Sequence, residues 1–409
     1  MNELASLGII LLFALLAGHL VKYVRVPEVT GYILAGVMVG PSALGWITHE
    51  NLISLGVFSE VALGLILFSI GSVFERNRFR LIGRRAVLLT IAESLLTGIL
   101  VTSGLAFAGQ PWTVCLLLGA ISMETAAAST LMVIRECNAK GELTEILTNV
   151  IALNNICCLI CFSLAAALVD LSAGQTHGAG LAAALRNVVF PLVWQLVGSV
   201  ALGYLVGLLL SAWASRVKEH GETLILMAGS VLLCVGVSKW LELSPLIASL
   251  AVGATMVNLS GNSRGLFDAL SKTDPPLYAI FFVIAGADLN LALLPSLGLL
   301  GGIYIVARSA GKFAGARGSA TALGFSHSVR QFIGLAMFSQ AGLAIGLVLV
   351  TVERFPAIAP TISTVVLASV AVFELFGPLG ARIALVRCGE VRPDEPEPAA
   401  LPDLSTAEP

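Results

Sequence analysis

Charged residues are scarce in this sequence. Asp, Glu, Lys and Arg make up 12% of its 409 residues, and the formal net charge is −2. A soluble domain carries about 25% charged residues, whereas this chain is 57% hydrophobic, with a mean hydropathy of +0.94. A soluble fold of this length is therefore excluded, and the expected partner is the lipid bilayer. The lack of a basic excess argues against a nucleic-acid partner.

Residues that carry enzyme chemistry are also few. The chain has five histidines and seven cysteines. The CxxC pair, Cys158 and Cys161, lies inside an apolar run with no second pair or histidine cluster near it, so neither a disulfide framework nor a zinc site is expected. No nucleophile–base pair or phosphate-binding loop is evident. We expect no enzyme activity, no cofactor, and no metal beyond a transported ion.

Long apolar runs dominate what is present. A bilayer is crossed by about 20 apolar residues in a helix, and thirteen runs approach this length. They cover roughly residues 4–22, 28–47, 52–74, 86–108, 113–134, 145–169, 187–214, 222–240, 244–260, 275–291, 294–316, 330–352 and 358–386. The sequence therefore predicts an all-α polytopic membrane protein with about thirteen transmembrane helices.

Basic residues orient these spans. They gather in alternate loops and in the C-terminal segment: Lys22, Arg25, Arg76, Arg78, Arg80, Arg84, Arg85, Arg135, Lys140, Arg216, Lys218, Arg264, Lys272, Arg317, Arg330, Arg382, Arg387 and Arg392. The opposite loops hold Arg186, Lys239 and Arg354. The positive-inside rule then predicts an N-terminus outside and a C-terminus in the cytoplasm. We expect the chain to lie in the cell (inner) membrane.

The last residues differ in composition from the rest. Residues 1–388 form the predicted membrane domain, and residues 389–409 are rich in proline and acidic residues. Such a composition cannot bury enough apolar surface to fold. We expect residues 389–409 to be a disordered cytoplasmic tail.

One carboxylate lies near the middle of the fifth run. Glu124 has hydroxyl-bearing neighbours, Ser122, Thr125 and Ser129, and small residues at 126–128 that allow another backbone to approach. An ionisable group at such a depth is costly, on the order of 3 kcal/mol, and functional by default. The alternatives are a carboxylate that faces a water-filled cleft or one that pairs structurally with a cation.

Further polar residues lie in other spans. Asn154 and Asn155 are either hydrogen-bonding groups between helices or ion ligands. Arg308 and Lys312 share a helix face and either extend to the interface or have an internal role. The carboxylates Glu93 and Glu374, in the fourth and thirteenth spans, are expected to form structural pairs.

Two interrupted spans occupy corresponding places in the two halves of the chain. Ser339 and Gln340 precede a glycine-rich break in the twelfth span, and the polar stretch around Glu124 interrupts the fifth. Paired interruptions of this kind indicate the binding site of a secondary transporter. Free backbone groups at a break can hold ions where they line a cavity.

Several segments together resemble the second monovalent cation:proton antiporter family, in its Kef-type, sodium/proton exchanger-like branch. They are PEVTGYILAGVMVGPSALG, LGLILFSIGSVFE, SPLIASLAVGATMVN, FFVIAGADL, ARSAGKFAGA, FSQAGLAIGL and FELFGPLGARIAL, in that order. The resemblance implies inverted repeats with two crossed, broken helices, and a core domain that moves against a dimerisation domain. It also implies a homodimer, and a separate regulatory subunit is compatible with it.

The sequence departs from this family at its titrating residue. The family's aspartate falls at position 155, where this chain has asparagine, and an amide does not titrate near neutral pH. We predict that Glu124 replaces it as the shared ligand of proton and cation, that Thr125, Asn154 and Asn155 add neutral oxygens, and that Lys312 lies nearby. Residues with a supporting role in this prediction are Ser122, Ser129, Arg308, Ser339 and Gln340.

Three functions remain open on the sequence. The first is exchange of Na⁺ or K⁺ for protons by alternating access. The second is an uncoupled cation pathway, which the asparagine at position 155 would permit. The third is a receptor or partner subunit that keeps the fold without transport. The sequence does not choose between Na⁺ and K⁺, because both prefer oxygen ligands.

Overall fold

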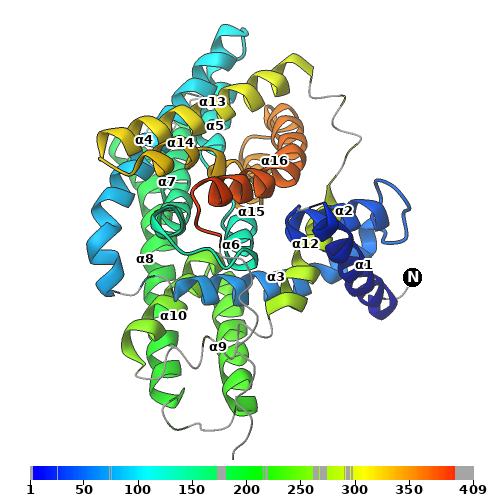
Figure 1. Cartoon of the computed structure of the whole chain (residues 1–409). Helices are drawn as coiled ribbons and strands as arrows, with labels where there is room; N and C mark the ends of the chain where they lie inside the picture. Colours follow the sequence, from blue (N-terminus) through cyan, green and yellow to red (C-terminus); the bar gives the residue numbers. More distant parts are fainter. Residues whose placement is uncertain are drawn as a thin grey trace, which may run out of the picture.

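The computed structural model describes residues 3–24, 26–72, 74, 76–172, 181–214, 216, 220–260, 267, 274–289, 291, 295 and 298–391. Throughout these residues the regular secondary structure is helical (Figure 1). Between its ends a helix satisfies its backbone groups internally, as a segment in lipid must. The basic residues Arg25, Lys218, Arg264 and Lys272 and the predicted tail from 392 onward lie outside the described residues.

Each predicted span coincides with a helix or a broken helix. The first seven are α1 (Glu3–Tyr23), α2 (Glu28–Val39), α3 (His49–Gly71), α4 (Arg76–Phe107), α5 (Trp112–Ser122) with α6 (Ala127–Glu136), α7 (Glu142–Ser172) and α8 (Leu181–Ala214). The others are α9 (His220–Trp240), α10 (Pro245–Leu259), α12 (Asp274–Asp288), α13 (Gly298–Ala322), α14 (His327–Phe332) with η3 (Leu335–Met337) and α15 (Gly342–Arg354), and α16 (Ala359–Arg387). Within the described chain, eight helical stretches are long and apolar enough to cross a membrane.

The order of the elements repeats. In the first half a long helix, α4, precedes the broken pair α5/α6 and the long α7; in the second half α13 precedes the broken α14–α15 segment and the long α16. The contacts repeat as well, since α2 packs on α12 and α10 packs on α3. In the two repeats α2 corresponds to α10, and α3 corresponds to α12. The contact of α2 with α12 therefore corresponds to the contact of α10 with α3. This is the pattern expected of the predicted inverted repeat.

Glycines allow several helices to cross in close contact. Gly36 of α2 and Gly286 of α12 lie against each other's backbone, and so do Gly71 of α3 and Gly253 of α10. A Cβ added at any of these positions would clash with main-chain atoms of the facing helix. Small residues allow such approaches in membrane helices, where packing rather than the hydrophobic effect drives association.

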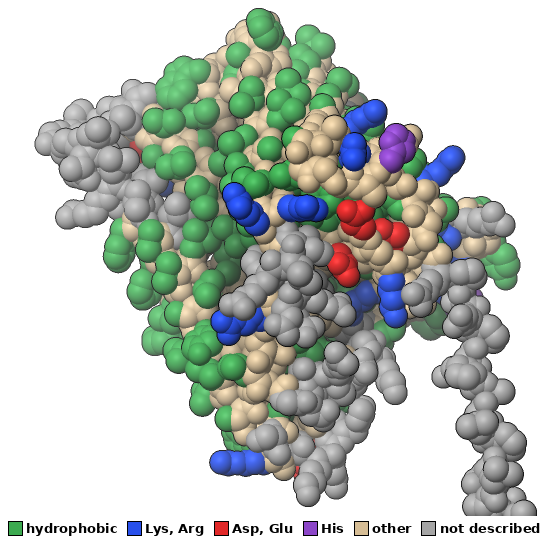
Figure 2. All heavy atoms as spheres, turned by 60° about the vertical axis from the view of Figure 1, so that its left-hand side comes forward, with side chains coloured by type: hydrophobic (Ala, Val, Ile, Leu, Met, Phe, Trp, Pro, Cys, Tyr) green, Lys and Arg blue, Asp and Glu red, His purple; other side chains and the backbone are tan. Residues whose placement is uncertain are grey.

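The helices form two groups (Figure 1). The core group comprises α4, α5, α6, α7, α13, α14, α15 and α16, and α4 and α13 pack along each other within it. The panel group comprises α1, α2, α3, α9, α10 and α12, with α8 packed on α10. Much of the face drawn in Figure 2 is hydrophobic, and its Lys and Arg side chains are spread from the upper right to the lower end.

The start of the predicted tail contacts the membrane domain. The Glu390 carboxylate accepts hydrogen bonds from the backbone N–H groups of Leu143 and Thr144, at 2.6 and 2.8 Å, at the N-terminus of α7. This side chain satisfies donors that the first turn of a helix leaves free. Residues 389–391 therefore pack against the domain instead of leaving it.

Candidate ion-binding site

The two helix breaks meet inside the core group. The N–H of Ala126, between α5 and α6, donates to the Ser339 carbonyl at 3.0 Å. The N–H of Ala341, between η3 and α15, donates to Oε2 of Glu124 at 3.2 Å. The prediction of paired interruptions at Glu124 and at Ser339–Gln340 is thus confirmed. Backbone groups freed at one break are satisfied by the other, as lipid-embedded irregular segments require.

Arg308 holds the two breaks together. Its guanidinium donates to the carbonyls of Ser122 and Glu124 at 3.1 and 2.6 Å, and to those of Phe338 and Ser339 at 2.7 and 3.2 Å. The side chain is fully buried, so an interfacial position is wrong for Arg308. The positive charge faces carbonyl groups at helix ends, where the partial charge is negative.

Lys312, one turn further along α13, forms a separate ion pair. Its Nζ lies 2.7 Å from Oε1 of Glu93 on α4, and both side chains are fully buried. It also donates to Oγ1 of Thr125 at 2.8 Å. Asn154 donates to Oε2 of Glu93 at 3.3 Å. Structural pairing of Glu93 is confirmed, and Lys312 has the internal position that the sequence left open.

The predicted ion ligands fall into two separate groups in the structure. Thr125 and Asn154 belong to the Glu93–Lys312 cluster, where Asn154 also donates to Oγ of Ser94 at 2.9 Å. Close packing positions this cluster, because Gly311 and Gly315 of α13 leave no room for a Cβ against Thr97 and Glu93 of α4. Lys312 is therefore the direct partner of Glu93, and Glu124 has no ion pair with it within the described residues.

Glu124 and Asn155 instead face a small cavity of about 40 Å³. Its lining includes a third polar residue, Glu374 of α16, together with Phe281 and Phe282 of α12. Glu124 is 1% exposed, and the cavity lies beside the crossing of the two breaks. A space of this size can hold a bare cation or about one water molecule. Carboxylate and amide oxygens are the ligands that hard cations prefer.

Glu374 is the residue that the sequence reading misjudged. Neither of its carboxylate oxygens has a hydrogen-bond partner among the described residues, although the side chain is only 5% exposed. The expectation of a structural pair is therefore wrong for Glu374. Its place in an apolar span gave a signal, but that signal could not separate a paired carboxylate from one that faces a cavity.

The supporting residues lie around the breaks. Ser122 donates to the Gly119 carbonyl at 2.6 Å. Gln340 donates to the Ile121 carbonyl at 3.2 Å and to the hydroxyl of Tyr304, a residue the sequence reading missed, at 2.9 Å. The buried hydroxyls of Ser129 and Ser339 have no partner among the described residues. These groups fix the breaks, and they do not line the 40 Å³ cavity.

A wider cavity connects the site to one surface. It has a volume of about 560 Å³ and lies between α3 and α12 of the panel group and α15 and α16 of the core group. It shares Phe281, Phe282 and Glu374 with the small cavity, and Glu60 and Asp288 line it as well. Carboxylates therefore line the route from this surface to Glu124.

A second cavity lies between the groups where the loops are basic. Its volume is about 870 Å³, and its lining includes Lys22, Arg135, Glu136 and Arg382. It shares no lining residue with the 40 Å³ cavity. Core–panel hydrogen bonds lie in the wall of this cavity: the Glu28 N–H donates to Oε2 of Glu136 at 2.8 Å, and Arg135 donates to Oγ of Ser69 at 2.7 Å.

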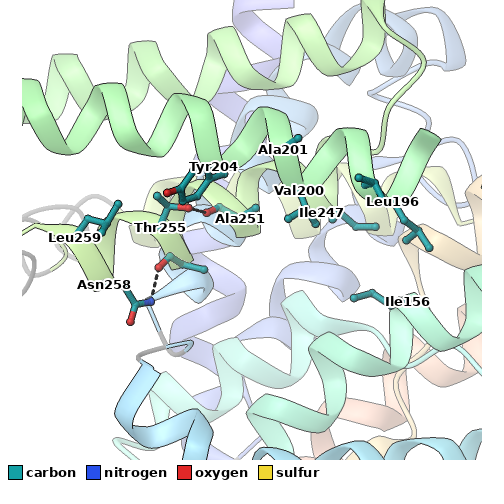
Figure 3. Close-up of a pocket in the computed structure, with 12 residues that line it drawn as sticks. Ile156, Leu196, Val200, Ala201, Tyr204, Ile247, Ala251, Thr255, Asn258 and Leu259 are labelled. Carbon is teal, nitrogen blue, oxygen red and sulfur yellow. Dashed lines mark hydrogen bonds between the residues drawn. The ribbon is translucent and has the colours of Figure 1, made fainter. Parts of the chain in front are cut away.

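A third hollow carries little polarity. It measures about 710 Å³ and is lined by aliphatic residues of α7, α8 and α10 (Figure 3). The hydroxyl of Thr255 and the amide of Asn258 in its wall donate to carbonyls of their own helix, at 2.7 and 2.6 Å. No charged side chain lines it, which distinguishes it from the 560 and 870 Å³ cavities.

Comparison with known proteins identifies the class. The family model for the sodium/hydrogen exchanger transmembrane domain matches residues 8–386. The chain therefore belongs to the sodium/hydrogen exchanger family, a family of cation:proton antiporters, and is a multi-pass membrane protein. Two solved structures of the sodium proton antiporter MjNhaP1 from Methanocaldococcus jannaschii share its fold. One has a TM-score of 0.64 at 19% identity, covering 94% of this chain and 95% of that one; the other has a TM-score of 0.72 at 18% identity, covering 95% and 98%.

Two curated relatives are also transport proteins. The iron transporter MagA of Paramagnetospirillum magneticum is 31% identical over 144 residues, which span 34% of this chain and 31% of MagA. The chain thus matches about a third of that relative's length. The ammonium/H⁺ antiporter subunit AmhT of Alkalihalophilus pseudofirmus is 22% identical over 292 residues, 71% of each chain. These relatives are transporters, in line with a chain that is not an enzyme.

Proposed function

We propose that this protein exchanges a monovalent cation for protons by alternating access, with Glu124 as the shared ligand. The observation that carries the proposal is the position of Glu124. Its carboxylate is buried beside the crossing of two broken helices and faces a cavity that continues to one surface. A titrating group there can hold either a proton or a cation, and this competition couples their movements.

The chemistry of the neighbouring side chains supports Glu124 over position 155. Asn155 faces the same cavity, but its amide cannot titrate near neutral pH. Its unpartnered Oδ1 supplies a neutral oxygen to a cation. Glu93, a further buried carboxylate of the core, is paired with Lys312. Glu124 thus takes the part that an aspartate at 155 has in the Kef-type pattern, whereas Thr125, Asn154 and Lys312 hold the breaks in place.

Two cavities on opposite sides of the site support alternating access. The 560 Å³ cavity shares lining residues with the site, whereas the 870 Å³ cavity shares none and has the core–panel contacts Arg135–Ser69 and Glu136–Glu28 in its wall. Movement of the core group against the panel group would break these contacts and close the wider entry. By the positive-inside rule the basic cavity is cytoplasmic and the structure faces outward. We further propose a homodimer in the inner membrane, with the N-terminus outside.

The choice of cation is part of the test. Na⁺ and K⁺ are the candidates that the oxygen ligands favour, and the similarity to an ammonium/H⁺ antiporter subunit adds NH₄⁺. The purified full chain would be reconstituted in liposomes with a pH-sensitive dye inside and an imposed pH gradient. Na⁺, K⁺, Li⁺ and NH₄⁺ would be added in separate runs. The cation that the wild-type protein transports should collapse the pH gradient across the liposome membrane. Because NH₃ crosses lipid unaided, protein-free liposomes set the background for NH₄⁺.

Two variants sharpen this assay. Glu124→Gln should abolish cation-dependent proton flux, and Glu124→Gln/Asn155→Asp should restore part of it, because the aspartate returns a carboxylate to the same cavity. Glu50→Gln, at an exposed site on α3, is the matched control and should behave as wild type. Normal exchange in Glu124→Gln would contradict the proposal.

The same preparation separates the alternatives. Cation flux measured with a radioactive isotope, but without accompanying proton flux, would favour an uncoupled pathway. No flux of any cation in wild-type liposomes would favour a receptor or partner subunit that retains the fold.

A further inference from the structure

The residue left unexplained by the site is Glu374. It is 5% exposed, lines both the 40 Å³ cavity and the entry cavity, and has no hydrogen-bond partner for either oxygen among the described residues. A buried carboxylate is costly unless it is paired or protonated. Glu124 and Asn155 face the same small space. The unpartnered oxygens of Glu374 and Asn155 are therefore available to a ligand in that cavity.

The net charge of the buried core groups bears on what the small cavity can bind. Among the described residues, the centre holds three buried carboxylates and two buried cations: Glu93, Glu124, Glu374, Arg308 and Lys312. With all of them ionised, the charges sum to one negative charge. Glu93 and Lys312 cancel within their ion pair. Two carboxylates, Glu124 and Glu374, then remain to balance the single charge of Arg308.

Neutrality is restored by one added positive charge. In a low-dielectric interior a net charge is strongly disfavoured, and two carboxylates that face one small space do not both stay ionised unless a cation lies between them. One proton shared by the pair satisfies this condition. One monovalent cation bound between them, with the Asn155 oxygen as a further ligand, satisfies it equally.

We propose that Glu124 and Glu374 act as a carboxylate pair that holds either one proton or one monovalent cation, so that exchange is one for one and electrically silent. This inference rests on the proposed antiport and names the residue that completes its site. In a cycle the pair releases one proton to one side as it takes up one cation. It then returns with one proton from the other side, and no net charge crosses the membrane.

The surroundings contain few other groups that could change this count. Glu93, Arg308 and Lys312 are fixed in the contacts described above. The side chains of Tyr304 on α13 and Cys158 on α7 are buried and neutral in their ordinary forms. Glu60 of α3 and Asp288 of α12 line the entry cavity and not the small one.

The null point of wild-type liposomes tests the stoichiometry. One-for-one exchange stops when the cation and proton gradients are equal and point in the same direction, for example tenfold each. This null point stays fixed when a lipophilic cation imposes a membrane potential. Exchange of two protons per cation would stop at a smaller proton gradient and would shift with the potential, because each charge moved responds to the field. Such a shift would overturn the inference.

Glu374→Gln tests the pair itself. Loss of the Glu374 carboxylate leaves the charges of Glu124 and Arg308 to cancel each other without a ligand. Both the proton and the cation therefore bind more weakly. We expect the KM for the cation to rise about tenfold or more and the pH of half-maximal exchange to fall. Glu374→Asp should recover much of the wild-type behaviour, and Glu353→Gln, at an exposed position on α15, is the matched control.

The outcomes distinguish this inference from the proposed function. If the wild type exchanges cations for protons and Glu124→Gln does not, but Glu374→Gln keeps the wild-type KM and pH profile, the carboxylate pair is wrong and the antiport stands. If wild-type liposomes show no cation-dependent proton flux, both fall. If Glu374→Gln does not fold, Glu374→Asp decides: a wild-type null point with an altered KM supports the pair, and a voltage-dependent null point contradicts it.

Discussion

The backbone N–H of Ala341 donates to Oε2 of Glu124 across 3.2 Å, so that the break in α14–α15 contacts the carboxylate of the break in α5/α6. The two residues are 217 positions apart in the chain. This contact ties the candidate ion ligand to the opposite repeat. A change of charge at Glu124 therefore acts on both broken helices together, which is what a site at a moving crossing needs.

Removal of one partner of the Glu93–Lys312 pair should destabilise the protein more than removal of both. Lys312→Met leaves a buried, unpaired carboxylate, which costs about 3–5 kcal/mol, whereas Glu93→Gln/Lys312→Met removes both charges and should cost much less. Thermal unfolding of the four proteins of this cycle in detergent gives the coupling. The control is Lys239→Met, because the Lys239–Glu60 pair is exposed and worth about 0–1 kcal/mol. Equal losses for the single and double variants would contradict the role given to the pair.

Arg308 should be irreplaceable even by lysine. A single ammonium group cannot reach the four carbonyl oxygens that the guanidinium fork contacts. Arg308→Lys is expected to lower exchange at least tenfold, since each lost charged hydrogen bond is worth about 1.5–3 kcal/mol. Arg317→Lys, at an exposed position on the same helix, should change nothing. Flux per folded protein, with folding checked by gel filtration, makes the comparison; normal exchange in Arg308→Lys would contradict it.

The packing of α13 on α4 should depend on Gly311. A Cβ at this position would lie 2.6 Å from the Thr97 Cα, so Gly311→Ala must push the helices apart, at a cost of about 1–3 kcal/mol. Gly318 lies on the same helix with open space around it. Gly318→Ala should be neutral or stabilising by about 0.5–1 kcal/mol, as expected for glycine in a helix. Comparison of the two melting temperatures tests this; equal values would contradict the close contact.

The contacts between Arg135 and Ser69 and between Glu136 and Glu28 should keep the basic cavity separate from the site. Arg135→Ala removes a charged hydrogen bond worth about 1.5–3 kcal/mol, and this favours conformations in which the cavity opens. Cys137, next to these residues and 8% exposed, is a native reporter. We expect a water-soluble maleimide to label it about tenfold faster in Arg135→Ala.

Peptide mass spectrometry would assign the labelled cysteine in that experiment. Lys239→Ala is the control, because Lys239 and Glu60 both belong to the panel group and their separation leaves the core–panel contacts intact. An unchanged labelling rate at Cys137 in Arg135→Ala would show that this hydrogen bond does not hold the cavity closed.

The site was only partly predictable from the sequence. Glu124, Asn155 and the two breaks could be found because polar groups stand out in apolar spans, where each is costly. The sequence could not show that Thr125 and Asn154 belong with Glu93 and Lys312. That division depends on how α4, α7 and α13 pack, and on distances of a few ångström between residues far apart in the chain.

The amino-acid sequence by itself determined where the helices run and which class of protein this is, because lipid requires apolar segments of fixed length with satisfied backbones. It also placed Arg308 and Glu374 within predicted spans, with the depth of Arg308 left open. Only the tertiary structure decided that Arg308 bridges the breaks and that Glu374 faces the cavity of Glu124 without a partner. The physical reason is that a buried charge must be balanced, but the sequence does not say by which group.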